Sequence, residues 1–251
     1  MTTITLIGTG RLSFNLMNEI LEIESLQLNQ IYGRSMFRPK HISDDIDYIK
    51  DIDNLKHSDF YFICVSDDQI LNVSKKLNVN DRVVVHLSGS TEMSILLHHQ
   101  NFGVFYPLQT FSYESELSFK EIPILIEANN KKTLAKINTL AKLFSRKVRK
   151  MNSKKRLICH LSATIANNFS NHMIVTAEKI LENNKIDKKL IRPLVFETIK
   201  KLQKMNAVDA QTGPAVRNDL LTIKKHMKQL NESEFLNLYK EITKSIMSNE
   251  L

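Results

Sequence analysis

A glycine turn near the start of the sequence constrains the fold most. The short β-branched, apolar run at residues 3–7 leads into Gly8-Thr9-Gly10, and apolar residues then recur at helical spacing. A strand, a G-x-G-x-x-S turn ending at Ser13 and a helix, in this order, form the dinucleotide-binding fingerprint. Gly8 allows the tight turn and Gly10 lets the backbone approach a pyrophosphate at the helix N-terminus. We therefore predict a nucleotide site formed by Gly8, Thr9, Gly10, Arg11 and Leu12.

Strand and helix signals alternate through the first half of the chain. Apolar runs at residues 30–32, 60–65, 82–86, 102–105 and 122–126 read as further strands. Helices are expected after Ser66-Asp67-Asp68, at residues 91–99 with Ser90 or Thr91 as cap, and at residues 131–144. This alternation predicts right-handed crossovers and a doubly wound parallel sheet.

Strand signals stop near residue 151, and helical patterns follow at residues 154–183, 187–204, 218–230 and 233–247. The predicted fold class is α/β, an N-terminal doubly wound Rossmann sheet followed by an all-α C-terminal domain. We expect residues 1–151 to bind the dinucleotide and residues 152–251 to form a helical substrate and dimerisation domain.

The end of the second strand indicates which nucleotide binds. NAD sites usually carry an acidic residue there for the ribose 2′-hydroxyl, but this sequence has Tyr32-Gly33-Arg34-Ser35. Arg34 can make two hydrogen bonds to a phosphate and Ser35 can add a third, which predicts NADP as the cofactor. The alternative is that Arg34 is an ordinary surface arginine.

Composition excludes several other classes of protein. The 251 residues carry a net charge of +8, and the stretch from Lys131 to Arg156 contains no acidic residue. It could bind nucleic acid or be a solvated helix face; we favour the second because Phe144 is its one aromatic residue. The chain has no apolar run long enough to span a membrane, no metal-binding cysteine pair and no signal-peptide pattern. We therefore expect a cytoplasmic protein with no nucleic-acid or membrane partner.

Polar and small residues follow several predicted strands, where ligands bind in such sheets. Val65, Ser66, Asp67 and Pro107 are further candidates for cofactor binding, and Ser88 is a candidate catalytic residue. His86 reads as either a core histidine or a catalytic one. A polar stripe without Lys, Glu or Arg runs along the next helix, at His160, Thr164, Asn167, Asn168 and Asn171. Further on, Arg217 could contact an anion or an interface, and Asn218 or Asp219 could cap a helix.

Several segments together resemble a known family. They are LIGTGRLS, YGRS, ICVSDDQI, HLSGS, FYPLQTF, CHLSATIANNF and TGPAVRND. The chain resembles, over essentially its whole length, the Rossmann-like NADP oxidoreductases with a C-terminal helical domain of unknown function. These are distant relatives of pyrroline-5-carboxylate reductase, ketopantoate reductase and the 6-phosphogluconate/3-hydroxyisobutyrate dehydrogenase superfamily. The resemblance implies NADP binding, a homodimer built by the helical domains and a cleft between domains.

The sequence departs from the hydroxyacid branch of these relatives. There a catalytic lysine precedes an asparagine by four residues; here Asn168 matches the asparagine, but Thr164 stands at the lysine position. Threonine is a poor proton donor near neutral pH, which leaves His160 as the titratable candidate one turn earlier. Tyr106 also stands where many relatives have histidine.

Two hypotheses remain open. In the first, an NADP-dependent oxidoreductase transfers hydride to or from a small carbonyl, imine or hydroxy compound at the interdomain cleft, with His160, Asn168 and Ser88 as catalytic residues. In the second, the protein is a non-catalytic NADP-binding sensor or scaffold, which the threonine at position 164 favours.

Overall fold

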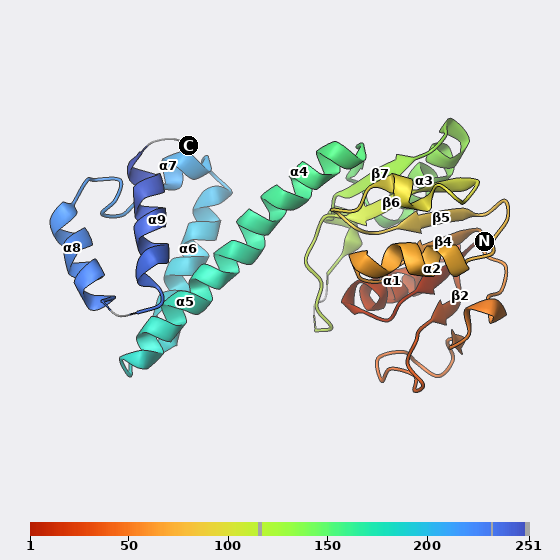
Figure 1. The fold of residues 1–251 in the computed structure, drawn as a ribbon, viewed down its shortest axis with the longest axis horizontal. Helices are drawn as coiled ribbons and strands as arrows, with labels where there is room; N and C mark the ends of the chain where they lie inside the picture. The colour runs from red at the N-terminus through yellow and green to blue at the C-terminus, as the bar shows by residue number, and fades with distance from the viewer. Residues whose placement is uncertain (115–116, 232, 249–251) are drawn as a thin grey trace. The chain divides into compact units, whose positions relative to one another are not determined.

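The computed structural model describes residues 1–114, 117–231 and 233–248. It divides into two compact units, Met1–Ala166 and Asn167–Leu251. The described part of the first unit contains an eight-stranded sheet with the order β3-β2-β1-β4-β5-β6-β7-β8 (Figure 1). Its strands are β1 (Thr2–Ile7), β2 (Leu26–Tyr32), β3 (Tyr48–Ile49), β4 (Phe60–Ile63), β5 (Val83–His86), β6 (Asn101–Pro107), β7 (Ile124–Ala128) and β8 (Val148–Lys150). Neighbouring strands are parallel, except that β6 and β7 are antiparallel.

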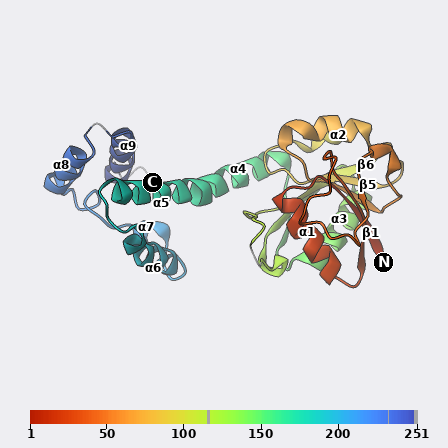
Figure 2. The ribbon, with the colours of Figure 1, turned by 90° about the horizontal axis from the view of Figure 1, so that it is seen from below.

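Helices cover both faces of this sheet, which explains why its central strands are apolar throughout. Helices α1 (Arg11–Glu22) and α3 (Lys131–Phe144) pack on one face, and α2 (Ile70–Lys76) packs on the other (Figure 2). Leu16 and Phe144 belong to the first core cluster, and Ile70 belongs to the second. The fold class predicted from the sequence, a doubly wound Rossmann sheet followed by helices, is confirmed.

The strand order changes direction between β1 and β4, because the chain goes outward through β2 and β3 before it returns. At such a switch point the loops at the carboxyl ends of the two strands diverge and leave a crevice. The glycine turn follows β1 at this crevice, so the topology places a ligand site where the fingerprint predicts one.

The prediction of a helix at residues 91–99 is wrong. The structure has only the 3₁₀ turn Met93–Leu96, with Glu92 rather than Ser90 or Thr91 at its N-cap. The Ser88 hydroxyl accepts hydrogen bonds from the backbone N–H groups of Ser90 and Thr91, at 3.1 and 2.9 Å. These bonds hold the backbone in a turn where a helix would have had to begin. Further 3₁₀ turns are Ile52–Asn54, Asp67–Gln69 and Phe119–Glu121.

The chain leaves the sheet at Lys150 and enters α4 (Ser153–Ala163), which belongs to the first unit. A π-helical segment, Thr164–Phe169, follows where the sequence predicts regular α-helix. The compact division lies inside this segment, whereas the functional boundary at residue 151 stays a prediction. Single π-helical turns are rare and frequently lie at functional sites.

The described residues of the second unit are helical or irregular, as predicted. Its helices are α5 (Ser170–Asn183), the 3₁₀ turn Lys188–Ile191, α6 (Arg192–Leu202), α7 (Ala207–Ala210), α8 (Leu220–Gln229) and α9 (Leu236–Met247). Asp219 caps α8, because its carboxylate accepts a hydrogen bond from the Thr222 N–H at 3.0 Å. Among the described residues, no helix combines the length and apolar character needed to cross a membrane.

Candidate functional site

A pocket of about 330 Å³ opens at the carboxyl ends of β1, β2 and β4. It is lined by Gly8, Thr9, Gly10, Tyr32, Gly33, Arg34, Ser35, Cys64, Val65, Ser66, Gln69 and Val73. Seven of the residues predicted to bind the cofactor line this pocket: Gly8, Thr9, Gly10, Arg34, Ser35, Val65 and Ser66. Arg11, Leu12, Asp67 and Pro107 do not line it, and their roles stay predictions.

Gly8 occupies a position that only glycine fits. Its φ of +121° is in the left-handed region, and a Cβ atom would lie 2.4 Å from the carbonyl oxygen of Cys64. The Gly8 N–H donates to the Tyr32 carbonyl at 2.8 Å, and the Ser13 hydroxyl donates to the Gly8 carbonyl at 2.7 Å. Serine at the third fingerprint position is therefore accommodated, because its hydroxyl bonds the turn that it packs against.

Gly10 leaves space for a ligand. A Cβ atom built on Gly10 would meet no heavy atom within 4 Å, and Gly10 caps α1 without any side-chain hydrogen bond. The first N–H groups of α1 thus have no side chain to satisfy them and carry the positive end of the helix dipole. An open cradle of this kind fits the pyrophosphate of a dinucleotide.

Arg34 and Ser35 lie at the outer edge of this pocket, and both are exposed. Among the described residues, Arg34 forms no ion pair, although it contributes a small electrostatic effect on the nearby Asp68. The guanidinium of Arg38 is used in contacts within the protein: it donates a hydrogen bond to the Ile46 carbonyl at 2.7 Å and lies 5.7 Å from the centre of the Tyr48 ring. Of these two arginines, Arg34 is the one that lines the pocket and whose guanidinium is left for a ligand.

A second group of side chains meets at the carboxyl ends of β5 and β6. The Tyr106 hydroxyl lies 3.1 Å from Nδ1 of His160, and the two rings meet edge to face with centroids 6.0 Å apart. Gly89 is buried against both, because a Cβ atom there would lie 2.6 Å from His160 Nδ1 and 2.7 Å from Tyr106 Cζ. We call Gly89, Tyr106 and His160 the histidine cluster. No local pattern in the sequence predicts the contact between Tyr106 and His160, because the two residues lie 54 positions apart.

The Tyr106 phenol engages Nδ1 of His160 and leaves Nε2 as the other ring nitrogen. Burial raises the pKa of Tyr106, so its O–H remains protonated at neutral pH. This O–H can donate to Nδ1 of His160, in which case the neutral imidazole carries its proton on Nε2, or the phenol oxygen can accept an Nδ1–H, in which case Nε2 is a proton acceptor. In both arrangements Nε2 is the ring nitrogen left for a ligand.

Buried Arg156 anchors the helix that carries His160. Its side chain is 1% exposed, and Nη1 lies 2.6 Å from the Glu127 carboxylate of β7. Nη2 also donates to the Thr91 carbonyl and, at 3.2 Å, to the Ser153 hydroxyl. One turn of helix separates Arg156 from His160, so these contacts fix the imidazole relative to the sheet.

His86, the last residue of β5, and Ser88, in the loop that follows, are joined by a hydrogen bond. His86 is fully buried and accepts the Ser88 N–H at its Nδ1 atom, 3.2 Å away. Burial, with Arg156 nearby, lowers the pKa of His86 to about 3, so its ring is neutral. The Ser88 hydroxyl accepts two backbone N–H groups, and the Ser90 hydroxyl donates to Asp67. A catalytic role for Ser88 stays a prediction.

The hydroxyl of Thr164 is used within its own helix. It donates to the His160 carbonyl at 3.0 Å, so the side chain at the expected lysine position offers no proton. Asn168 is exposed and belongs to the second unit, and its place in a site stays a prediction.

Comparisons with known proteins identify a matching family and similar structures. Residues 122–246 match the family described as "Domain of unknown function (DUF2520)". A structure from Bacteroides fragilis, named as a "putative NADP oxidoreductase", is 30% identical, with 99% of this chain and 98% of that chain covered and a TM-score of 0.89.

Two more distant structures share the fold. A 1-pyrroline-5-carboxylate reductase from Streptococcus pyogenes is 16% identical, with a TM-score of 0.62 over 98% of this chain and 96% of that chain. A reductive aminase from Aspergillus terreus, in complex with NADPH, is 10% identical, with a TM-score of 0.72 over 100% and 95%. A search of curated proteins finds no match. The identity and coverage of the Bacteroides structure show that the chain belongs to the Rossmann-like NADP oxidoreductase family with a helical C-terminal domain.

Proposed function

We propose that the protein is an NADP-dependent oxidoreductase that transfers hydride to or from a small carbonyl, imine or hydroxy compound. The histidine cluster carries this proposal, because it supplies a held imidazole at the same edge of the sheet as the nucleotide pocket. Similar structures are named as an NADP oxidoreductase and as a reductive aminase bound to NADPH, which supports the type of reaction.

The residues of the pocket fit the nucleotide. The uncapped N-terminus of α1 and the open side of Gly10 would hold the pyrophosphate, and Arg34 with Ser35 would hold the 2′-phosphate. Bound NADPH supplies the hydride. Val65 and Ser66 would border the nucleotide at the end of β4.

His160 would move the proton that accompanies the hydride. Because Tyr106 bonds Nδ1, Nε2 is the atom that would exchange the proton. In reduction the imidazolium would donate its Nε2 proton and become neutral, with Nδ1–H donating to the Tyr106 oxygen; in oxidation this neutral ring would accept a proton at Nε2. Thr164 cannot replace a lysine, because its hydroxyl donates to a backbone carbonyl. An imine substrate that arrives protonated would depend less on this group.

The test is to supply NADPH with small keto acids and cyclic imines and to follow the loss of nicotinamide absorbance. Turnover is expected with at least one class. His160→Gln should then lower kcat about 100-fold or more, the scale of general acid catalysis. Tyr106→Phe should lower it by about tenfold through the lost hydrogen bond, and NADPH affinity should stay unchanged.

His57→Gln is a suitable control, because His57 is exposed and lies outside both groups. Turnover that is unchanged in His160→Gln would remove His160 from the mechanism. Tight NADPH binding with no turnover across the panel would instead favour the sensor or scaffold, the alternative that Thr164 supports.

We also propose that the helical unit forms a homodimer. On α6, Leu194, Phe196 and Ile199 are 68%, 73% and 57% exposed. Large apolar side chains gathered on one helix are typical of a protein interface. Light scattering should give a molar mass of two chains for the wild-type protein and of one chain for Phe196→Asp. A wild-type protein that is monomeric at micromolar concentration would contradict this proposal.

A further inference from the structure

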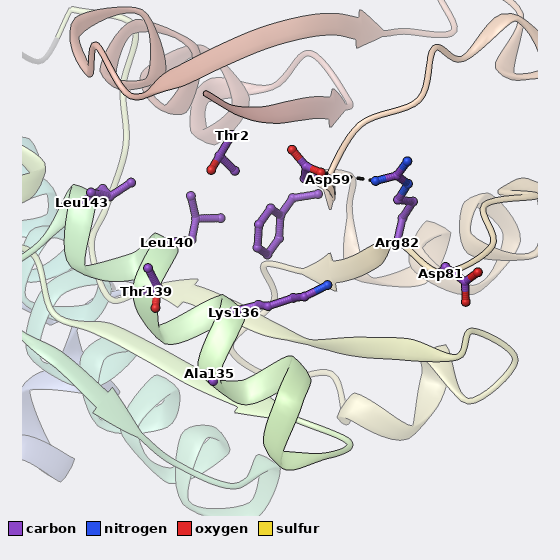
Figure 3. A pocket seen from close by; sticks show the side chains of 10 residues that line it. Thr2, Asp59, Asp81, Arg82, Ala135, Lys136, Thr139, Leu140 and Leu143 are labelled. Atoms are coloured by element: carbon purple, nitrogen blue, oxygen red, sulfur yellow. Dashed lines mark hydrogen bonds and ion pairs between the residues drawn. The ribbon is translucent and has the colours of Figure 1, made fainter.

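Figure 3 shows a second pocket, of about 490 Å³. Its lining residues place it at the amino-terminal ends of the strands, opposite the carboxyl ends where the glycine turn lies. Its walls are the amino-terminal ends of β1, β4 and β5 and one face of α3. Thr2 lines it at the start of β1, whereas Gly8 follows the end of that strand, about 20 Å away at the usual rise per residue. The pocket is therefore distinct from the nucleotide site.

The floor of this pocket is apolar. Phe60 and Leu140 are 5% and 3% exposed and belong to the main core cluster, so they form a fixed surface. Leu143, one turn further along α3, is 41% exposed and extends this surface toward solvent. A ligand with a short hydrocarbon chain would remove this apolar surface from water.

The rim of the pocket holds an ammonium group, that of Lys136, whose charge contributes a small electrostatic effect on the Asp59 carboxyl. Asp59 is already engaged, because it accepts the N–H and hydroxyl of Thr3, at 3.0 and 2.9 Å, and pairs with Arg82 at 3.3 Å. The Lys136 side chain extends toward these strand ends (Figure 3), yet in the described part of the chain its ammonium makes no hydrogen bond or ion pair. Asp81 lies at the edge of the pocket, beside Arg82 (Figure 3).

We propose that this pocket binds a small carboxylate with a short apolar chain. The chain would cover Phe60, Leu140 and Leu143, and the carboxylate would pair with the Lys136 ammonium. Thr2 and Thr139 also line the pocket, and each carries a hydroxyl group of the kind that can donate to a carboxylate. The site also gives a specific use to one lysine of the acid-free segment from Lys131 to Arg156.

The test is a calorimetric titration of the full chain with butanoate, hexanoate and octanoate, with and without saturating NADPH. Affinity should rise with each added methylene by up to about fourfold, the limit set by complete burial. Lys136→Met should weaken octanoate binding by about tenfold, because the lost contact is a charge-assisted hydrogen bond at an exposed site. Lys132→Met is the matched control, since Lys132 is on the same helix but does not line the pocket.

Uncharged 1-octanol separates the apolar contact from the contact between the carboxylate and Lys136. Its affinity should be the same for wild type and for Lys136→Met, because it carries no carboxylate. The proposal is overturned if octanoate shows no saturable binding, or if Lys136→Met binds it as well as wild type does. Competition between octanoate and NADPH would also overturn it, because the carboxylate would then occupy the nucleotide pocket. Inorganic phosphate that binds as tightly as octanoate would show that the apolar floor contributes nothing.

Discussion

Replacement of Gly89 by alanine tests whether the histidine cluster is packed as the structure shows. The new Cβ would lie 2.6 Å from His160 Nδ1 and 2.8 Å from its Cγ, which is about 0.8 Å short of ordinary contact for the closer atom. Gly89 has no positive φ, so the substitution adds no backbone strain. Overpacking costs about 1–3 kcal/mol and the Tyr106 hydrogen bond about 1 kcal/mol. Gly89→Ala should therefore lower the free energy of unfolding by about 2–4 kcal/mol in a urea titration.

The same substitution made in a His160→Ala background gives the decisive comparison. Without the imidazole the contact with Tyr106 Cζ at 2.7 Å remains, but the tyrosine ring can shift into the space that the imidazole leaves, and no Tyr106–His160 bond remains to break. The cost of Gly89→Ala should therefore be smaller by about 1 kcal/mol or more. Gly10→Ala is the control, because its Cβ meets nothing within 4 Å, and it should change stability by less than about 1 kcal/mol while weakening NADPH binding. An equal cost of Gly89→Ala in both backgrounds would refute the packing argument.

Three further predictions follow from charged and buried groups. Arg34→Ala should weaken the binding of NADPH about tenfold and leave the binding of NADH unchanged. The control Lys40→Ala should change neither affinity, and an equal loss of affinity for both nucleotides in Arg34→Ala would exclude a 2′-phosphate contact. The pKa of His86 is lowered to about 3 from an ordinary 6.5, so the folded chain binds fewer protons and stability is lost as the pH falls from 6.5 toward 3. In His86→Asn, the free energy of unfolding measured in urea titrations should fall less steeply between these two pH values. Glu127→Gln should destabilise the chain by about 3 kcal/mol, because it leaves buried Arg156 without its counter-charge, and added Arg156→Met should recover most of the loss; an unchanged urea midpoint would contradict this.

The nucleotide pocket was accessible from sequence because local rules position its parts. A tight turn needs Gly8, and a strand end followed by a helix start defines the cradle at Gly10. Tyr32, Cys64 and Gln69 also line the pocket and were not predicted, although the carboxyl ends of β2 and β4 are where such residues are expected. The Ser13 bond to the Gly8 carbonyl was not evident, since the fingerprint treats that position as a matter of size alone.

The histidine cluster was only half predicted, because its pairing depends on tertiary structure. His160 was singled out as a titratable residue, but its partner Tyr106 comes from a strand 54 residues earlier. The helix expected at residues 91–99 failed for a related reason, since the Ser88 hydroxyl and the Ser153 hydroxyl bind the backbone that would have formed its first turn. Side chains that compete for backbone N–H groups in this way leave no periodic signal.

The nucleotide pocket and the histidine cluster are held in place by different interactions. We therefore expect substitutions to affect cofactor binding and catalysis separately. The nucleotide pocket is built from backbone turns and an uncapped helix, and His160 is not among the residues that line it, so we expect Arg34 to affect nucleotide affinity alone. The histidine cluster is held by Gly89 packing and by the Arg156–Glu127 pair, neither of which lines that pocket. Substitutions in the cluster should therefore change kcat with the NADPH affinity intact. A protein selected only to bind NADP would not need a fixed imidazole beside a buried tyrosine, and this argument favours the oxidoreductase over the sensor.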